Sequence, residues 1–179
     1  MAKQIRDSIA RKTPPLDHIE GRFAFIADDI LRRNVTIAVQ YIVFLIAILD
    51  EEKANDSTIS SSIHKDMILY TASIVEGCLH HCLQQHITSG AISTNKVMPN
   101  NWITKNPKPL YEISSTERII GATQVRSAEE LKSNTQFIII NKAARKANIL
   151  TQKLFDKANR LREMRNAIHL KGLRAVDDL

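Results

Sequence analysis

The run from Val35 to Leu49 most constrains the fold, because nearly all of its residues are apolar. As an α-helix it would be about 22 Å long, shorter than the roughly 30 Å hydrocarbon core of a membrane. Arg32 and Arg33 precede the run, and four charged residues follow it at 50–53. We therefore interpret it as a buried helix over about residues 23–53, with a membrane span as the alternative. Because such a helix must be covered on most sides, a second copy of the chain is a candidate for part of that cover.

The size and charge of the chain are those of a soluble globular protein. Its 179 residues suffice for one domain, and the apolar share of 44% and charged share of 25% are ordinary. Lys and Arg exceed Asp and Glu by 25 to 19, which gives a formal net charge of +6. That surplus permits contact with nucleic acid but does not demonstrate it. The first residues lack the apolar segment of a signal peptide, so we expect a cytoplasmic protein without membrane contact.

Sequence patterns predict a mainly all-α fold with a small β insertion. Residues 1–20 are polar and contain Pro14-Pro15, which indicates a flexible or extended lead-in to a single helical domain over 21–179. After the first helix, a turn is expected at 55–57. Apolar residues then recur at helical spacing over about 63–87, with Glu76 the one acid deep in this second helix.

The second half of the chain alternates between loop, strand and helix signals. Residues 89–109 contain three prolines and read as a loop, whereas residues 110–125 hold two β-rich segments and predict a hairpin. The capping-box pattern at 127–130 predicts a helix to about residue 147. Thr151 is the predicted cap of a last helix that ends near Leu170. The expected architecture is a four-to-five-helix bundle with a hairpin insertion.

Four polar side chains share one side of the predicted last helix. At about 100° per residue from Arg162, Arg165 falls near about −60°, Asn166 near about +40° and His169 near about −20°. A neighbouring stripe of apolar residues would face the core: Leu154, Leu161, Met164 and Ile168. Two guanidiniums, an amide and an imidazole at the rim of a packed surface suit an anion, above all a phosphate.

A helical bundle whose last helix carries Arg165-Asn166 followed closely by His169 resembles the HEPN superfamily (higher eukaryotes and prokaryotes nucleotide-binding). The family motif is Arg, then four to six residues led by a polar one, then His. The gap to His169 is six from Arg162 and three from Arg165, so which arginine has the family role stays open. The second helix around Glu76, where the family often has an acid, is also similar, as is the hairpin.

The resemblance implies a function and an assembly. Many HEPN proteins are metal-independent endoribonucleases that act as homodimers, with the two motif helices forming one composite site. Others are toxins of toxin–antitoxin pairs or parts of phage-defence systems, and some only bind a nucleotide, RNA or a protein. We therefore expect an endoribonuclease whose partners are RNA, a second copy and an antitoxin or defence-system protein. The alternative is a non-catalytic binding module.

The motif residues have the chemistry that RNA cleavage without metal or cofactor needs. His169 can exchange protons near neutral pH, and Arg162 and Arg165 can contact phosphate oxygens as negative charge builds. Asn166 can orient the imidazole or donate to phosphate, and Glu76 can position an arginine from across the bundle. The alternative for Glu76 is an ordinary exposed glutamate. The alternative for the cations is a solvated face that offsets the helix dipole.

Two weaker features favour structural interpretations. Cys78, Cys82 and His86 lie along one helix, where Cys78 and His86 are about 12 Å apart, so one tetrahedral zinc cannot gather them. We predict buried cysteines beside exposed histidines, and no metal. Trp102 is expected to anchor its loop to the core, with stacking on a base as the alternative.

Overall fold

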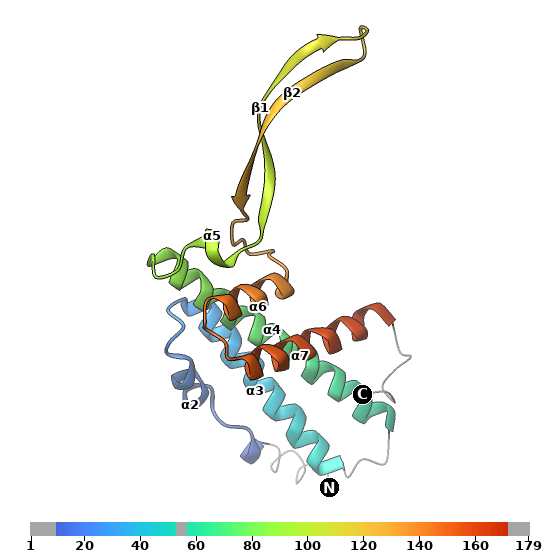
Figure 1. The fold of residues 1–179 in the computed structure, drawn as a ribbon. Helices are drawn as coiled ribbons and strands as arrows, with labels where there is room; N and C mark the ends of the chain where they lie inside the picture. The colour runs from blue at the N-terminus through green and yellow to red at the C-terminus, as the bar shows by residue number, and fades with distance from the viewer. Residues whose placement is uncertain (1–9, 53–56, 172–179) are drawn as a thin grey trace.

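The computed structural model describes residues 10–52 and 57–171, except for the side chains at 51, 52, 57 and 169–171. The described chain is mostly helical and contains one two-stranded antiparallel sheet (Figure 1). The mainly α fold with a β-hairpin is thereby confirmed. The elements in chain order are α2 (Leu16–Glu20), the 3₁₀ turn η1 (Gly21–Phe23), α3 (Asp29–Glu52), α4 (Ser57–Thr88), α5 (Thr94–Val97), β1 (Asn100–Glu112), β2 (Arg118–Ala128), α6 (Phe137–Lys146) and α7 (Gln152–Lys171).

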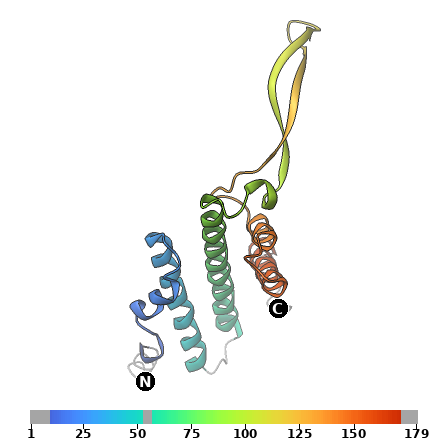
Figure 2. The ribbon, with the colours of Figure 1, turned by 60° about the vertical axis from the view of Figure 1, so that its left-hand side comes forward.

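The helices form a body in which α4 is central. Figure 2 shows α3 on one side of α4, and α6 and α7 on the other. The core lies on the α6–α7 side, where Leu79 of α4 packs with Phe137 and Ile140 of α6 and with Ala158 of α7. A second cluster joins Leu83 of α4 to Met98, next to α5. The buried apolar residues of α6 are large at its start, Phe137 and Ile140, and small further on, Ala143 and Ala144, and this helps α6 to pack closely against its neighbours.

The helix α3 is much less buried than the sequence predicts. Only 22% of the Asp29–Asp50 stretch is buried, so the prediction of a buried helix is wrong for the single chain. Val35, Leu45 and Ala47 are buried, while Ile30, Ile37 and Phe44 stay exposed. By length and composition alone, α3 is also apolar enough to cross a membrane.

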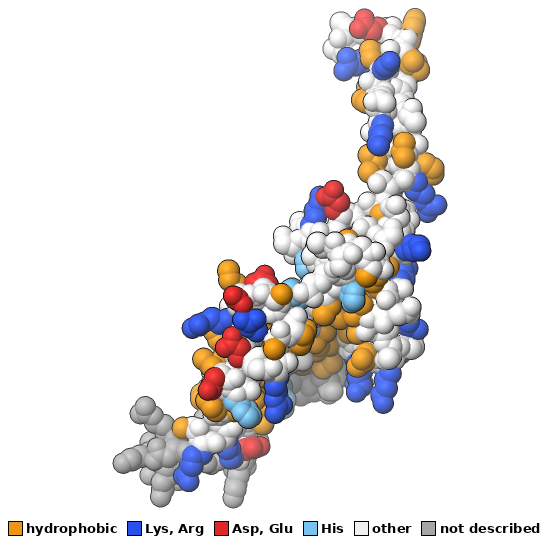
Figure 3. Space-filling model, turned by 90° about the vertical axis from the view of Figure 1, so that its left-hand side faces the viewer, with side chains coloured by type: hydrophobic (Ala, Val, Ile, Leu, Met, Phe, Trp, Pro, Cys, Tyr) orange, Lys and Arg blue, Asp and Glu red, His pale blue; other side chains and the backbone are white. Residues whose placement is uncertain are grey.

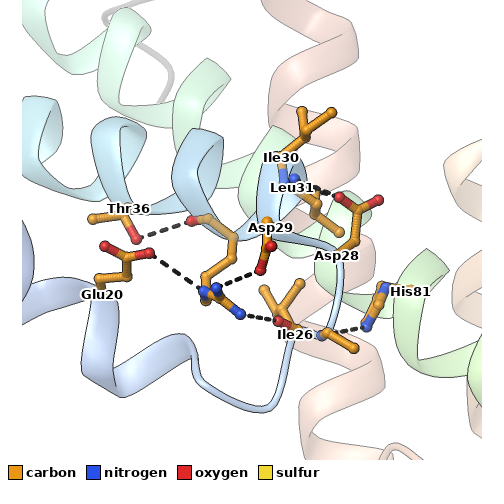
Figure 4. A network of polar contacts seen from close by, with 10 residues as sticks. Glu20, Ile26, Asp28, Asp29, Ile30, Leu31, Thr36 and His81 are labelled. Atoms are coloured by element: carbon orange, nitrogen blue, oxygen red, sulfur yellow. Dashed lines mark hydrogen bonds and ion pairs between the residues drawn. The ribbon is translucent and has the colours of Figure 1, made fainter.

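The segment before α3 is held by a polar network around Arg32 (Figure 4). The Arg32 guanidinium donates to Glu20 at 3.3 Å and to the Ile26 carbonyl at 2.9 Å. The Ala27 amide donates to Nε2 of His81 on α4 at 3.3 Å. Within this segment, residues 16–20 form the helix α2, with Ile19 buried. This corrects the flexible or extended lead-in predicted there. Residues 1–9 lie outside the described chain.

The hairpin is longer than predicted, because it includes residues assigned to a loop. β1 starts at Asn100, so residues 100–109 are a strand despite Pro107 and Pro109. Register irregularities fall between Lys105 and Lys108 and between Pro109 and Tyr111, and Asn106 has a φ of 51°. Prolines are tolerated here because a two-stranded sheet has only edge strands and because bulges relieve the pairing.

The helix predicted from residue 127 starts ten residues later. Ser127 and Ala128 end β2, and a loop follows to Gln136, so the capping-box interpretation is wrong. Instead of starting a helix, Ser127 pairs with Asn101 in the sheet. The Glu129 amide donates a hydrogen bond to the Pro99 carbonyl at 2.9 Å, which also holds this segment out of a helix. The segment 137–140, which alone could pass for a strand, is the first turn of α6.

The last helix forms as predicted at its start. The Leu154 amide donates to the Thr151 hydroxyl at 3.3 Å, so Thr151 caps α7. Its apolar stripe is shifted from the prediction: Leu154 is 50% exposed, whereas Ala158 is buried. The predicted turn at 55–57 lies largely outside the described residues. The helix α7 is described to Lys171, one residue beyond the predicted end near Leu170.

Candidate functional site

A cavity of about 390 Å³ lies where α4, α7 and the start of α6 meet. Three of the predicted motif residues line it, namely Arg162, Arg165 and Asn166, and so does Glu76. The two motif cations, the motif amide and the predicted supporting acid are thus brought to one place. The remaining walls are residues 133–138, the end of the linker and the first residues of α6.

Arg165 is the most firmly held group in this cavity. Its guanidinium donates to a carboxylate oxygen of Glu76 at 2.5 Å, and the side chains are only 23% and 27% exposed. The same guanidinium carbon lies 5.5 Å from the centre of the Phe137 ring, which adds a cation–π contact. Of the two interpretations of Glu76, the structure therefore shows the one in which it positions a motif arginine.

Arg162 is held within its own helix. Its Nε donates to the amide oxygen of Asn159 at 3.1 Å, and Nη2 lies 3.2 Å from the carboxylate of Glu163. The Arg162 side chain is 20% exposed, and that of Glu163 is 59% exposed. Glu163 is absent from the cavity wall, so Arg162 can turn a free N–H toward a bound anion.

The start of α6 adds backbone donors to the cavity. Phe137 and Ile138 line it, and within the described chain their amides have no acceptor, as is usual in the first turn of a helix. The positive end of the helix dipole attracts anions at such a place. A weak signal for this wall is present in the sequence, namely the polar run Asn134-Thr135-Gln136 before an apolar segment. The helix predicted across 127–147 concealed it.

His169 belongs to α7 by its backbone, but its side chain lies outside the described part of the chain. One turn separates it from Asn166, which lines the cavity. Arg162, Arg165 and Asn166 therefore lie on one side of α7, as predicted. That His169 shares this side stays a prediction.

A wider cavity of about 650 Å³ adjoins the first at the base of the hairpin. Both are lined by Asn134, Thr135 and Gln136, so this linker segment forms a wall between them. The wider cavity also contains Glu129, Glu130 and Lys132. Its acids make it less attractive to phosphate than the arginine cavity.

The cysteines on α4 are half-buried thiols, and two of its histidines make hydrogen bonds with the backbone of neighbouring segments. Cys78 and Cys82 are free thiols and half-buried; burial raises the pKa of both, and the neighbouring Cys82 raises that of Cys78 further. His80 is hydrogen-bonded to the Lys132 carbonyl at 3.0 Å and His81 to the Ala27 amide, so neither is simply exposed as predicted. Across residues 10–52 and 57–171, no three His, Cys, Asp or Glu side chains gather where they could hold a metal ion.

The chain matches no known protein family, no curated protein and no solved structure.

Proposed function

We propose that this protein is a metal-independent endoribonuclease of the HEPN type. In this proposal it is a cytoplasmic homodimer that acts in phage defence or a toxin–antitoxin pair, and its four-helix core of α3, α4, α6 and α7 is a HEPN bundle. The cavity binds the phosphate at the cleavage point, with no metal or cofactor. Its protein partner, besides the second copy, is an antitoxin or another defence-system protein.

One observation carries the proposal, namely the convergence of Arg162, Arg165, Asn166 and the start of α6 on one cavity. Guanidiniums and free helix amides are the donors that proteins use for phosphate oxygens. They gain most as charge accumulates on those oxygens during cleavage. Arg165, fixed by Glu76 and Phe137, has the rigid placement that such stabilisation needs.

His169 has the proton-transfer role in this proposal. It takes the proton of the 2′-hydroxyl or gives one to the departing 5′-oxygen, and a dimer supplies a histidine for each end. The 2′-oxygen attacks phosphorus while the bond to the 5′-oxygen breaks, which leaves a 2′,3′-cyclic phosphate and a free 5′-hydroxyl.

A second candidate function is a non-catalytic module that binds a nucleotide, RNA or a protein. It is favoured by the ion pair of Arg165 with Glu76, which offsets one of the two positive charges of the cavity. A pocket of lower positive charge has less preference for the more highly charged transition state over the bound substrate.

The experiment compares cleavage of a mixed RNA pool in EDTA by the wild type and by His169→Ala, with analysis of the product ends. The wild type is expected to give cyclic-phosphate ends, and the variant to be slower by about 100-fold or more because proton transfer is lost. The matched control is His86→Ala, which removes an exposed histidine from the last turn of α4, away from the cavity.

Binding is measured on the same proteins by fluorescence anisotropy with labelled RNA. Retained binding by His169→Ala with lost cleavage supports the enzyme. Binding by the wild type without cleavage in EDTA favours the second candidate, and equal cleavage by wild type and His169→Ala refutes the proposed role of His169.

A further inference from the structure

The hairpin β1–β2 projects from the helical body as an arm of residues 100–128 (Figures 1 and 2). Nearly every strand residue is exposed, and large apolar side chains stand along the arm between Lys and Arg residues (Figure 3). Trp102 is 65% exposed, so it does not anchor this segment to the core, which corrects the sequence prediction. Since the two strands pack against little besides each other, their side chains are available to a ligand.

The strand pairing places Lys105, Lys108 and Tyr111 on one face of the arm, which we call the lysine face. Residues directly opposite each other in an antiparallel pair share a face, and so do alternate residues of a regular strand. The partners of these three residues are alternate residues of β2, namely Thr123, Gly121 and Ile119. Both lysines are exposed, and Tyr111 is 66% exposed. Two ammonium groups and an aromatic ring thus follow one another along the arm.

The two register irregularities produce this arrangement. Lys105, Lys108 and Tyr111 follow one another at intervals of three residues, and side chains three residues apart point to opposite faces of a regular strand. One irregularity lies between Lys105 and Lys108, and the other lies just before Tyr111. Each adds one residue to β1 relative to β2, which turns the next of the three side chains back to the same face.

The local sequence favours both irregularities. In the first, Asn106 has a φ of 51°, and Asn adopts this left-handed conformation more readily than most residues. In the second, the extra residue Leu110 lies over Gly121, where a Cβ atom would be 2.6 Å from its Cδ1. Because only glycine leaves that space free, the second irregularity depends on a glycine at position 121.

The lysine face carries positive charge without a neighbouring acid. Neither Lys105 nor Lys108 makes an ion pair with another residue of the described chain. The two acids of the arm, Glu112 and Glu117, are near its tip, and Glu112 lies opposite Arg118 on the other face. Unpaired ammonium groups on an exposed strand attract phosphate groups.

The lysine face continues into the candidate site. Ile103, two residues before Lys105, belongs to the same face and lines the wider cavity at the base of the arm. That cavity shares the wall Asn134-Thr135-Gln136 with the arginine cavity. Its acids can accept hydrogen bonds from the amino groups of nucleobases. A polymer with one phosphate in the arginine cavity is thereby led across the wider cavity to the arm.

We propose that the lysine face holds single-stranded RNA next to the phosphate that is bound in the arginine cavity. Lys105 and Lys108 contact neighbouring phosphates, and Tyr111 stacks on a base. The inference rests on the proposed function for the identity of the polymer as RNA. The arm binds and positions the strand, and it takes no part in proton transfer.

The geometry of the lysine face suits a single strand. Lys105 and Lys108 lie opposite residues two apart on β2, so they are about 6.6 Å apart along the arm. This is comparable to the distance between neighbouring phosphates of an extended strand. Tyr111 follows at a similar distance, and it can stack only on a base that is not already stacked within a duplex.

Salt-dependent binding tests the role of the two lysines. The probe is a labelled single-stranded RNA with 2′-O-methyl groups, which lack the attacking hydroxyl, so binding is measured without cleavage by fluorescence anisotropy. The double variant Lys105→Gln/Lys108→Gln is expected to bind about tenfold more weakly. The slope of log Kd against log salt should fall by about 1.4, because each phosphate contact to a single strand contributes about 0.7.

The matched control removes the same charge from the other face of the arm. Arg118 and Arg126 lie an odd number of residues from Thr123 on β2 and therefore point away from the lysine face. Arg118→Gln/Arg126→Gln is expected to weaken binding by less than about threefold, through the general loss of charge alone. Equal weakening by the two double variants overturns the inference, and so does a wild type that does not bind the RNA.

The two faces also offer a matched pair of aromatic residues. Tyr111 and Trp102 are almost equally exposed, at 66% and 65%, but Trp102 lies opposite Arg126 on the other face. Tyr111→Ala is expected to weaken binding about tenfold, because a stacked base is lost, whereas Trp102→Ala should bind like the wild type. A larger loss for Trp102→Ala contradicts the choice of face.

Cleavage of long and short RNA separates this inference from the proposed function. For a long RNA, kcat/KM of Lys105→Gln/Lys108→Gln is expected to fall about tenfold, in line with its binding. For an RNA of a few nucleotides, which fills the arginine cavity without reaching the arm, it should match the wild type. Binding through the lysine face without any cleavage refutes the proposed function and supports the inference. Cleavage of long RNA that the double variant performs as well as the wild type does the reverse.

Discussion

At the residue scale, one contact joins two helices that are far apart in the sequence. Arg165 of α7 and Glu76 of α4 meet at 2.5 Å with about a quarter of each side chain exposed. A charged hydrogen bond with this degree of burial contributes more to stability than a surface ion pair, although solvent still screens it. The pair therefore fixes both the position of Arg165 in the cavity and the approach of α7 to α4.

We predict that Glu76→Gln lowers the free energy of unfolding by about 1–2 kcal/mol, because the amide keeps the shape of the side chain but loses its charge. Urea denaturation followed by circular dichroism measures the change. The matched control is Glu163→Gln, which removes the carboxylate beside Arg162; because Glu163 is 59% exposed, we expect less than about 0.5 kcal/mol. Equal losses for both variants would show that the contact of Glu76 with Arg165 contributes no more to the free energy of unfolding than the exposed contact of Glu163 with Arg162.

The residues of the candidate site were more predictable than their surroundings. Helical spacing placed Arg162, Arg165 and Asn166 on one side of α7, and all three line the same cavity. The same spacing put Leu154 in the core, where it is not, since a helical wheel does not show how far neighbouring helices extend along α7. The sequence does not predict that Phe137 and Ile138 line the cavity, because this depends on where α6 begins.

At the scale of elements, local signals succeeded where no distant pairing competed with them. Thr151 begins α7 as predicted, since capping depends on residues within one turn. The capping-box pattern at 127–130 failed because Ser127 and Ala128 pair with Asn101 and Asn100, residues far away in the chain. For the same reason the prolines of β1 suggested a loop, although an edge strand tolerates them.

The cap of α7 yields a prediction at this scale. Thr151→Ala should destabilise the protein by about 1 kcal/mol, because the Leu154 amide loses its acceptor. Ser93 precedes α5 in the equivalent position but makes no capping hydrogen bond, so Ser93→Ala should change stability by less than about 0.5 kcal/mol. Thermal unfolding of both variants checks the difference, and a Ser93→Ala loss as large as that of Thr151→Ala would refute it.

At the scale of the whole molecule, the protein consists of a helical body and an arm that depend little on each other. The two hydrophobic clusters on this side of the body are formed by residues of α4, α6 and α7 and beside α5, and the hairpin residue packed against them is the partly buried Ala128. Asn101 and Ser127 are paired across the base of the arm, so their chain ends are already adjacent. A short turn can therefore replace the hairpin without moving α5 or α6.

We predict that replacing residues 102–126 by a two-residue Asn-Gly turn leaves the helical body folded. The expected change in its unfolding free energy is less than about 1 kcal/mol, since few buried apolar contacts are lost. Helical circular dichroism and thermal unfolding measure the body, and sedimentation measures assembly in the same sample. A folded monomer would assign dimerisation to the arm. A folded dimer would assign it instead to the exposed Ile30, Ile37 and Phe44 of α3, and an unfolded chain would contradict the independence of the body.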